Sequence, residues 1–155
     1  MPHIPGAEIS GIISNVRSHI EGLKEGDKVI VHNKVFDGTC DMCLKGLDMI
    51  CRNGELISVI TNGGFADYIA VPQRNVFRIL DDMSWDVAAS LTVTILTAFH
   101  ALREASLNIN EFLLVFGASG NTGMVATQIG KKMCAKVIAV SRNKWVKEFW
   151  SRLCN

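Results

Sequence analysis

The residues 36–51 carry three of the chain's five cysteines, Cys40, Cys43 and Cys51. Such short spacing is typical of a structural zinc site, but a closed tetrahedral site needs four ligands. The chain shows no charged and apolar leader at its start, which indicates a reducing cytosol, where clustered cysteines bind metal more often than they form disulfides. We therefore predict a cytoplasmic protein with a metal-binding loop. The cysteine spacing alone leaves the fourth ligand open.

A second motif, VFGASGNTG at 115–123, lies between an apolar strand and a helix. It is a G-x-x-G-x-x-G variant of the dinucleotide fingerprint, in which glycines allow a tight turn and close approach to a pyrophosphate. The following helix N-terminus favours an anion. We predict a dinucleotide site; the alternative is an incidental glycine-rich turn. The predicted cofactor residues of this turn are Gly117, Ser119, Gly120, Asn121, Thr122 and Gly123.

The end of the next strand, VIAVSRN, bears on the choice of dinucleotide. Proteins that bind NAD have an acidic residue there, whereas proteins that bind NADP have small and basic residues. This chain has Ser141 and Arg142 and no acid. Arg142 is suited to pair a 2′-phosphate through charge-assisted hydrogen bonds, and the alternative is a solvated surface charge. We predict NADP(H), with NAD less favoured.

The elements that must position these residues are of two kinds, predicted strands in the first part of the chain and mainly predicted helices after it. Residues 1–80 predict short strands at 9–16, 27–33 and 65–72, rich in Ile, Val and aromatics and separated by turn residues. From the N-cap Ser84, residues 85–106 predict one or two buried helices. Residues 111–145 predict a strand, the glycine turn, a helix, a strand and the start of another helix. That order is one βαβ unit.

Composition excludes several classes of function. Hydrophobic residues make up 48% of the 155-residue chain and charged residues 20%, which is globular. The net charge is +1 with both signs interspersed, so we expect no nucleic-acid partner and no membrane-surface role. No apolar run approaches the roughly 18 residues that are needed to span a bilayer.

Six stretches together resemble the medium-chain dehydrogenase/reductase superfamily, which includes zinc alcohol dehydrogenases and quinone oxidoreductases. These stretches are PHIPGAEISGII, LKEGDKVIV, GTCDMCLKGLDMIC, NGGFADYIAVP, LTAFHAL and VFGASGNTG. The resemblance runs to about residue 149. It implies an α/β protein: part of a GroES-like β-rich domain at 1–82, with a zinc lobe at 37–51, followed by a partial Rossmann cofactor domain at 83–155.

The resemblance also supplies the missing zinc ligand. The family frame C-x2-C-x2-C-x7-C places ligands at Asp37, Cys40, Cys43 and Cys51. A carboxylate thus replaces the first thiolate, and zinc accepts carboxylate oxygen. The resemblance implies a closed Cys3Asp structural site that fixes a loop and does no chemistry. The alternative is a loop that has lost its metal.

The catalytic zinc of the family has no ligands at the matching positions. The His of P-G-H-E is Ala7 here, and the Cys four residues before Thr97 is Val93. Neither side chain can hold a metal with an open coordination position. The chain therefore resembles the zinc-free reductase branch, with Glu8 as a structural acid. By the same resemblance, Thr97 and Thr122 lie behind the nicotinamide, and helix packing is the alternative for both.

The resemblance further implies that this chain is truncated at both ends. The first strands of the GroES-like domain are expected before Met1, and the second half of the cofactor sheet after residue 149. A frameshift near codon 150 is our hypothesis for the divergent tail WSRLCN. The predicted strands FLLVFGAS and KVIAVS are mainly apolar, which is typical of parallel strands buried on both faces of a sheet. We therefore expect exposed edges and apolar faces, marginal stability and association of the chain.

By descent, the function expected is hydride transfer between NADP(H) and a small-molecule substrate, an alcohol or aldehyde, an enone or a quinone, with one structural zinc. The resemblance implies a homo-oligomer for full-length family members. One alternative is a non-enzymatic remnant that keeps only the structural zinc site. Another is a small zinc-binding interaction module, which leaves the glycine fingerprint unexplained.

Overall fold

The change from strand-rich to helix-rich sequence coincides with a division of the structure into two units. The computed structural model describes residues 2–153. They form two compact units, Met1–Val93 and Thr94–Asn155. The division falls inside the interval 82–108 in which the sequence changes from strand-rich to helix-rich character. The predicted domain ranges stay a prediction.

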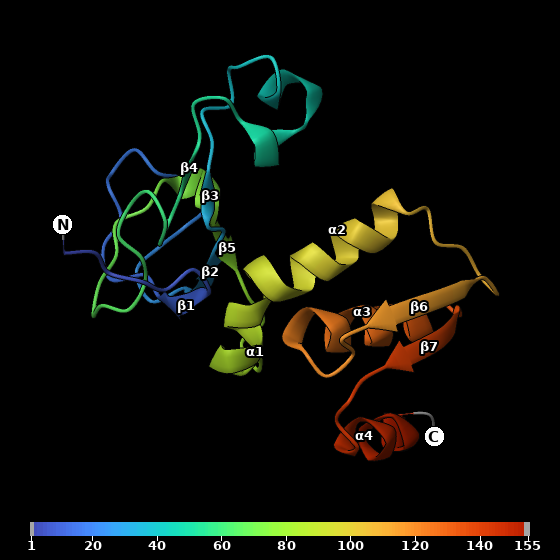
Figure 1. Ribbon diagram of the computed structural model, residues 1–155. Coiled ribbons are helices and arrows are strands. Elements are labelled where there is room, and N and C mark those ends of the chain that lie inside the picture. The colour runs from blue at the N-terminus through green and yellow to red at the C-terminus, as the bar shows by residue number, and fades with distance from the viewer. Residues whose placement is uncertain (1, 154–155) are drawn as a thin grey trace. The chain divides into compact units, whose positions relative to one another are not determined.

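The first unit is built on an antiparallel sheet with the order β1-β2-β5 (Figure 1). Its strands are β1 (Ile9–Ile12), β2 (Lys28–Val31) and β5 (Val76–Arg78). The central strand alternates half-buried and buried residues, with Val29 and Val31 inside, because successive side chains point to opposite faces. Pairing of β1 with β2 ends soon after Ile12, so both strands are shorter than predicted.

The predicted third strand at 65–72 is wrong. Gly64 and Phe65 still donate their backbone N–H groups to Gly6 O and Pro5 O. Beyond Phe65, up to Val71, the backbone finds no strand partner within residues 2–153. A strand exists only where a neighbour completes its ladder, so an extended, β-prone segment remains irregular.

A hairpin-like extension carries the cysteine loop away from this sheet. Strands β3 (Lys34–Val35) and β4 (Glu55–Leu56) pair antiparallel at its base, and Figure 1 shows the loop projecting beyond them. Fully buried Asn75, in the 3₁₀ turn η3 (Gln73–Asn75), donates from Nδ2 to His32 O and Lys34 O at 2.7 and 2.8 Å. These bonds fix the chain where it leaves the sheet.

Residues 85–104 are helical throughout, in three pieces. They are α1 (Trp85–Ser90), the π-helical turn η4 (Leu91–Ile95) and α2 (Leu96–Glu104). The prediction of helix is confirmed, but the stretch is largely exposed rather than buried. Ser84 occupies the N-cap without a side-chain cap bond. A hydrogen bond from its hydroxyl lowers the pKa of the Asp86 carboxylate.

The same stretch corrects an expectation about membrane spans. Trp85–Glu104 is twenty residues long and apolar enough to cross a bilayer by length and composition alone. Polar residues interrupt its apolar runs in the sequence, but the helix continues through η4 and so reaches this length. Core helices of soluble proteins pass the same test, so the finding is weak evidence for a membrane role.

The second unit is the predicted βαβ arrangement. Parallel strands β6 (Phe112–Phe116) and β7 (Lys136–Val140) are joined by α3 (Asn121–Lys132), and α4 (Trp145–Leu153) follows. Helix α3 packs on both strands and α2 packs on α3. The fold class is therefore α/β, as predicted.

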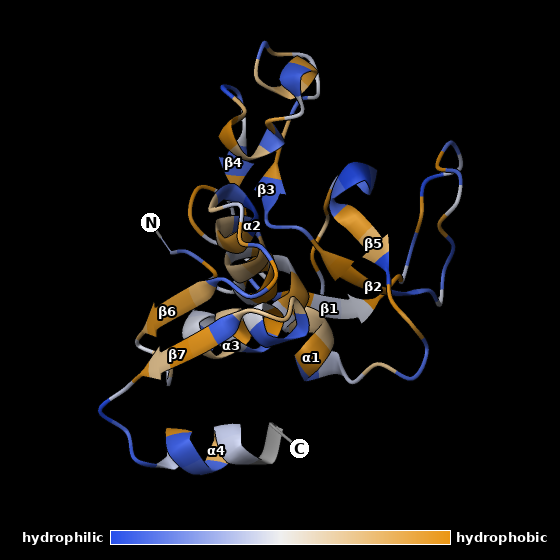
Figure 2. Ribbon diagram, turned by 90° about the vertical axis from the view of Figure 1, so that its right-hand side faces the viewer, coloured by the Kyte–Doolittle hydropathy of each residue, from blue (hydrophilic) through white to orange (hydrophobic). Residues whose placement is uncertain are grey.

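The core of the second unit lies on one face of its sheet. Val115, Ala118 and Val146 are buried together, with Leu113 and Val137 packed against them. Alternate residues of the same strands face away and stay exposed, and Figure 2 shows both strands mostly in hydrophobic colours. The exposed side chains of this open apolar face are Phe112, Leu114, Phe116, Ile138 and Val140. The expected exposed apolar face is confirmed.

Candidate metal centre and cofactor turn

The four predicted zinc ligands meet at one point of the lobe 37–51. One ligand atom from each of Asp37, Cys40, Cys43 and Cys51 lies within 4.8 Å of every other. Two short 3₁₀ turns, η1 (Cys43–Lys45) and η2 (Asp48–Ile50), fold the lobe back on itself. Gly46 closes η1 in the left-handed region, at φ 72°, where glycine is favoured.

The spacing of the sulfurs suits a tetrahedral ion. Cys40 Sγ lies 3.6 Å from Cys43 Sγ and 3.8 Å from Cys51 Sγ. A tetrahedral Zn²⁺ with Zn–S bonds of about 2.3 Å separates its sulfurs by about 3.8 Å, whereas a disulfide bond is about 2.05 Å. The donor set and its spacing therefore fit zinc.

The surroundings of Cys40 favour its thiolate, whereas those of Cys43 favour its protonated thiol. The N–H groups of Cys43 and Arg52 hydrogen-bond to the sulfur of Cys40 and lower the pKa of this thiol to about 7. Burial and the Cys51 thiol raise the pKa of Cys43 to about 12. A metal ion displaces thiol protons when it binds, so loading the cluster releases protons at neutral pH.

Asp37 is held as a carboxylate. The N–H of Thr39, the amide of Asn53 and the N–H of Cys40 hydrogen-bond to it, and they lower its pKa well below the usual range. On the lobe surface, the Arg52 guanidinium pairs with Asp41 through two bonds of 2.5 and 2.9 Å, and its charge also interacts with Cys40.

The lobe has almost no core of its own. Cys51 is its single buried residue, and Leu44, Leu47, Met49 and Ile50 are 47–77% exposed. Apolar burial therefore contributes little to its fold. A metal ion bound by the four ligand atoms would cross-link the lobe, and the side chains are arranged to provide this cross-link.

The glycine turn of the second unit has the form that the fingerprint requires. Gly117 has φ 72°, and its carbonyl accepts a hydrogen bond from Gly120 N–H at 2.9 Å. A Cβ at Gly123 would collide with Gly117 O, whereas a Cβ at Gly120 would lie 3.4 Å from the same atom. The geometry therefore requires glycine at 117 and 123 and tolerates a side chain at 120.

The first turn of α3 presents free amide groups. No side chain caps this helix at Gly120, and the first bond within it runs from Met124 N–H to Gly120 O. The N–H groups of Asn121, Thr122 and Gly123 thus lack intrahelical partners. Together with the helix dipole, they can bind an anion such as a phosphate.

Asn143 connects the turn to the end of β7. Its Nδ2 donates to Ser119 Oγ at 2.9 Å, and its backbone N–H donates to Ser141 Oγ at 3.0 Å. The structure therefore brings the predicted residues Ser119 and Ser141 together, with Arg142 exposed beside them. The sequence did not indicate Asn143, because no pattern links it to a serine 24 positions away.

A cleft adjoins this strand end. It has a volume of about 760 Å³ and its walls include Ser141, Arg142, Asn143 and Trp150. Thr97 lies exposed in the first turn of α2, and within residues 2–153 no hydrogen bond joins it to the glycine turn. Thr122 lies exposed in the first turn of α3. Their nicotinamide role stays a prediction.

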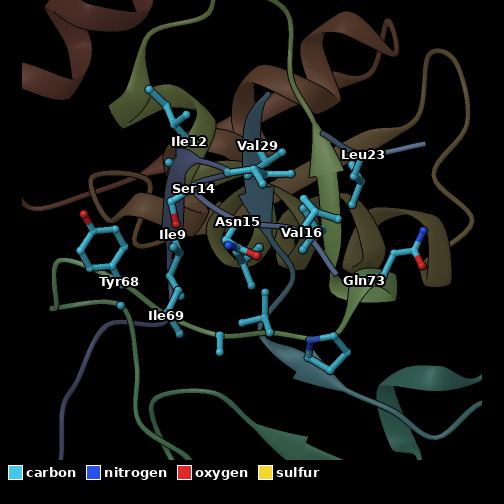
Figure 3. A pocket seen from close by; sticks show the side chains of 18 of the residues that line it. Ile9, Ile12, Ser14, Asn15, Val16, Leu23, Val29, Tyr68, Ile69 and Gln73 are labelled. Carbon is cyan, nitrogen blue, oxygen red and sulfur yellow. The ribbon is translucent and has the colours of Figure 1, made fainter. Parts of the chain in front are cut away.

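The first unit has a separate cavity of about 890 Å³. Figure 3 shows Ile9 and Ile12 of β1, Val29 of β2 and Ile69 of the unpaired segment around it. None of the residues predicted for metal or cofactor lines this cavity. It is thus not part of either candidate site.

One protein family, described as alcohol dehydrogenase GroES-like domain, matches this chain over residues 1–81, which is more than half of it. The chain belongs to this family. The relatives include an NAD-dependent alcohol dehydrogenase of Sulfolobus acidocaldarius, 34% identical over 84% of this chain and 38% of its own length. Another, from Saccharolobus solfataricus, is 33% identical over 89% of this chain and 40% of its own length.

Solved structures agree with this family. A thermostable alcohol dehydrogenase from Pyrobaculum aerophilum, with cobalt and zinc bound, is 34% identical and superimposes with a TM-score of 0.91. The match covers 98% of this chain and 46% of that one. The chain therefore spans about two fifths of the length of the curated relatives and just under half of this solved structure.

Proposed function

We propose that this protein is an oxidoreductase of the zinc alcohol dehydrogenase family that moves hydride between NADP(H) and a small molecule. The glycine turn carries this proposal. Its left-handed Gly117, its close contact at Gly123 and the free amides of α3 together suit a dinucleotide pyrophosphate. Family membership supports the hydride chemistry, with an alcohol or aldehyde, an enone or a quinone as the substrate class.

The lobe 37–51 would hold a structural zinc ion through Asp37, Cys40, Cys43 and Cys51. Their spacing within 4.8 Å supports this assignment, and the Pyrobaculum structure is described as binding cobalt and zinc. When bound, the ion cross-links the lobe and supplies no catalytic chemistry.

The hydride step itself would proceed without a zinc Lewis acid. The two covered positions of the family's catalytic ligand set carry Ala7 and Val93, which have no donor atoms. Rate enhancement would then come from holding the nicotinamide and the acceptor in contact. The protein's own part is to bind, orient and exclude water.

Arg142 supports NADP(H) over NAD(H). It is exposed at the end of β7, where no acid is present to bind a ribose 2′-hydroxyl. The curated relatives cited above are named NAD-dependent, so the choice of cofactor is a point on which this chain would differ from them.

Fluorescence titration with NADPH and with NADH tests the proposal. We expect saturable NADPH binding that weakens about tenfold or more in Arg142→Ala, because a charge-assisted fork to the 2′-phosphate is lost. NADH binding should change little. Arg103→Ala removes another exposed arginine of the same unit and is the matched control.

The opposite outcomes are equally clear. Equal loss of NADPH and NADH affinity in Arg142→Ala would remove the assignment of NADP(H). If metal analysis finds zinc but neither cofactor binds saturably, the protein would be a non-enzymatic one whose lobe is cross-linked by the metal. Hydride transfer to a quinone or an enone, followed at the nicotinamide absorbance, would identify the substrate class.

A further inference from the structure

The Asp37 carboxylate is nearly saturated with hydrogen bonds. Its Oδ1 accepts from the backbone N–H of Thr39 at 2.8 Å and of Cys40 at 3.0 Å. Its Oδ2 accepts from Asn53 Nδ2 at 2.6 Å. A carboxylate offers about four lone-pair sites. These three donors leave the fourth site on Oδ2. The Cys43 thiol also hydrogen-bonds to this carboxylate, and its proton would be lost when a metal binds.

These bonds have two different origins. The two bonds to Oδ1 form within a local turn of residues 37–40, which an aspartate makes with its own following amides. The bond to Oδ2 comes from Asn53, which lies 16 positions further along the chain and two beyond Cys51. Asn53 is thus the side chain that fixes the rotation of the carboxylate from outside the turn.

The main chain of Asp37 is held independently of its carboxylate. Arg74 Nη1 donates to Asp37 O at 2.6 Å and to Phe36 O at 3.2 Å. The guanidinium also lies over the Phe36 ring, 5.6 Å from its centroid. Removal of the Asn53 side chain therefore leaves the backbone of Asp37 and the two bonds to Oδ1 in place and removes only the bond to Oδ2.

A carboxylate needs such control where a thiolate does not. A thiolate presents one donor atom to a metal, whereas a carboxylate can bind through either oxygen or through both, and it is a harder donor. We propose that Asn53 is a positioning residue of the metal site, which directs Asp37 to bind the ion through Oδ2 alone. This inference rests on the proposed zinc site.

The test measures metal affinity in the full chain, in two backgrounds. Zinc affinity is obtained by competition with a chelator, and Co²⁺ titration reports tetrahedral coordination through its visible spectrum. Asn53→Ala should weaken zinc binding by about tenfold or more, as outer-shell substitutions do, and should alter the Co²⁺ spectrum. In the Asp37→Cys background, the same substitution should change affinity less than about twofold, because the thiolate needs no orientation.

Leu44→Ala is the matched control. It removes an uncharged side chain of the same lobe that is 77% exposed, and it leaves the hydrogen bonds of Asp37 in place. We expect it to leave zinc affinity and the Co²⁺ spectrum unchanged. Thermal unfolding without metal should be the same for wild type, Asn53→Ala and Leu44→Ala, since the lobe has almost no core.

The contrary results are distinguishable. Equal loss of affinity in the Asp37 and Asp37→Cys backgrounds would assign Asn53 a general structural role and overturn the inference. Unchanged affinity and spectrum in Asn53→Ala would overturn it as well, while leaving the zinc site intact. A wild-type chain that binds neither Zn²⁺ nor Co²⁺ would overturn the zinc site and this inference together.

Discussion

Cys134 ends α3 in a conformation that usually belongs to glycine. Its φ is 58°, and it is exposed. The N–H of Cys134 bonds to Lys131 O at 2.9 Å and the N–H of Ala135 bonds to Gly130 O at 3.0 Å. These two bonds are a Schellman motif, which satisfies the last carbonyl groups of the helix. A side chain in this left-handed position adds strain without adding packing.

Cys134→Gly should therefore stabilise the protein by about 1 kcal/mol, because relief of the strain exceeds the entropy that glycine loses on folding. The measurement is the free energy of unfolding in urea. Met133→Gly is the control: Met133 has φ −80°, so glycine there relieves nothing and should be neutral or destabilising. Equal effects of both substitutions would contradict this account.

Single residues also mark the limit of prediction from sequence. The cysteine spacing and the family frame predicted a cluster that the structure brings together at Asp37, Cys40, Cys43 and Cys51. The partners of Asp37 were not predictable, because hydrogen bonds from Asn53 and Arg74 depend on where the folded chain brings distant residues. No periodicity or spacing in a sequence encodes such contacts.

At the scale of elements, the backbone of the glycine turn requires glycine at 117 and 123 but accepts a side chain at 120. Gly123→Ala should force the first turn of α3 away from Gly117 O, displace the free amides and weaken NADPH binding by about tenfold or more. Gly120→Ala places its Cβ at an ordinary contact distance and should change affinity far less. Titration of both variants side by side checks this prediction.

If both variants lost affinity equally, the proposed difference between Gly120 and Gly123 would be wrong. If neither did, the cofactor would bind elsewhere on the chain. Unfolding curves for both variants control for loss of structure, since the collision at Gly123 involves backbone atoms and also costs stability.

Elements were predictable where local sequence decides them. Alternating or continuous apolar residues around the glycine turn predicted β6, α3 and β7, because each element contains its own signal. The segment 65–72 has equally strong β-forming residues, yet it is irregular because strands depend on a partner. Likewise, the sequence could predict the N-cap position of Ser84 but not that its hydroxyl would bond to Asp86.

For the molecule as a whole, the open apolar face of β6 and β7 has the largest consequence. Phe112 is 72% exposed and Phe116 is 75% exposed. Both free edges of this two-stranded sheet also present backbone groups for pairing. Exposed faces of this kind favour association or aggregation of the chain.

We predict that the protein self-associates in a concentration-dependent manner. Leu114→Lys together with Phe116→Lys should weaken self-association more than about tenfold, because each buried apolar side chain contributes about 2 kcal/mol. Sedimentation velocity over a range of concentrations measures this. Gln128→Lys, on the exposed side of α3, adds one such positive charge away from the face and should have little effect. A monodisperse wild-type monomer with a cooperative melt would refute the prediction.

With the proposed zinc ion bound, the lobe with its single buried residue would have a form of local stability that depends on the metal. An ordinary loop unfolds when temperature or denaturant overcomes its core, whereas this one would lose order when the free metal concentration falls below the dissociation constant. Its stabilisation grows with the logarithm of free zinc. The order of residues 37–51 would then follow the zinc buffering of the surrounding solution, while the sheets elsewhere in the chain would respond chiefly to heat.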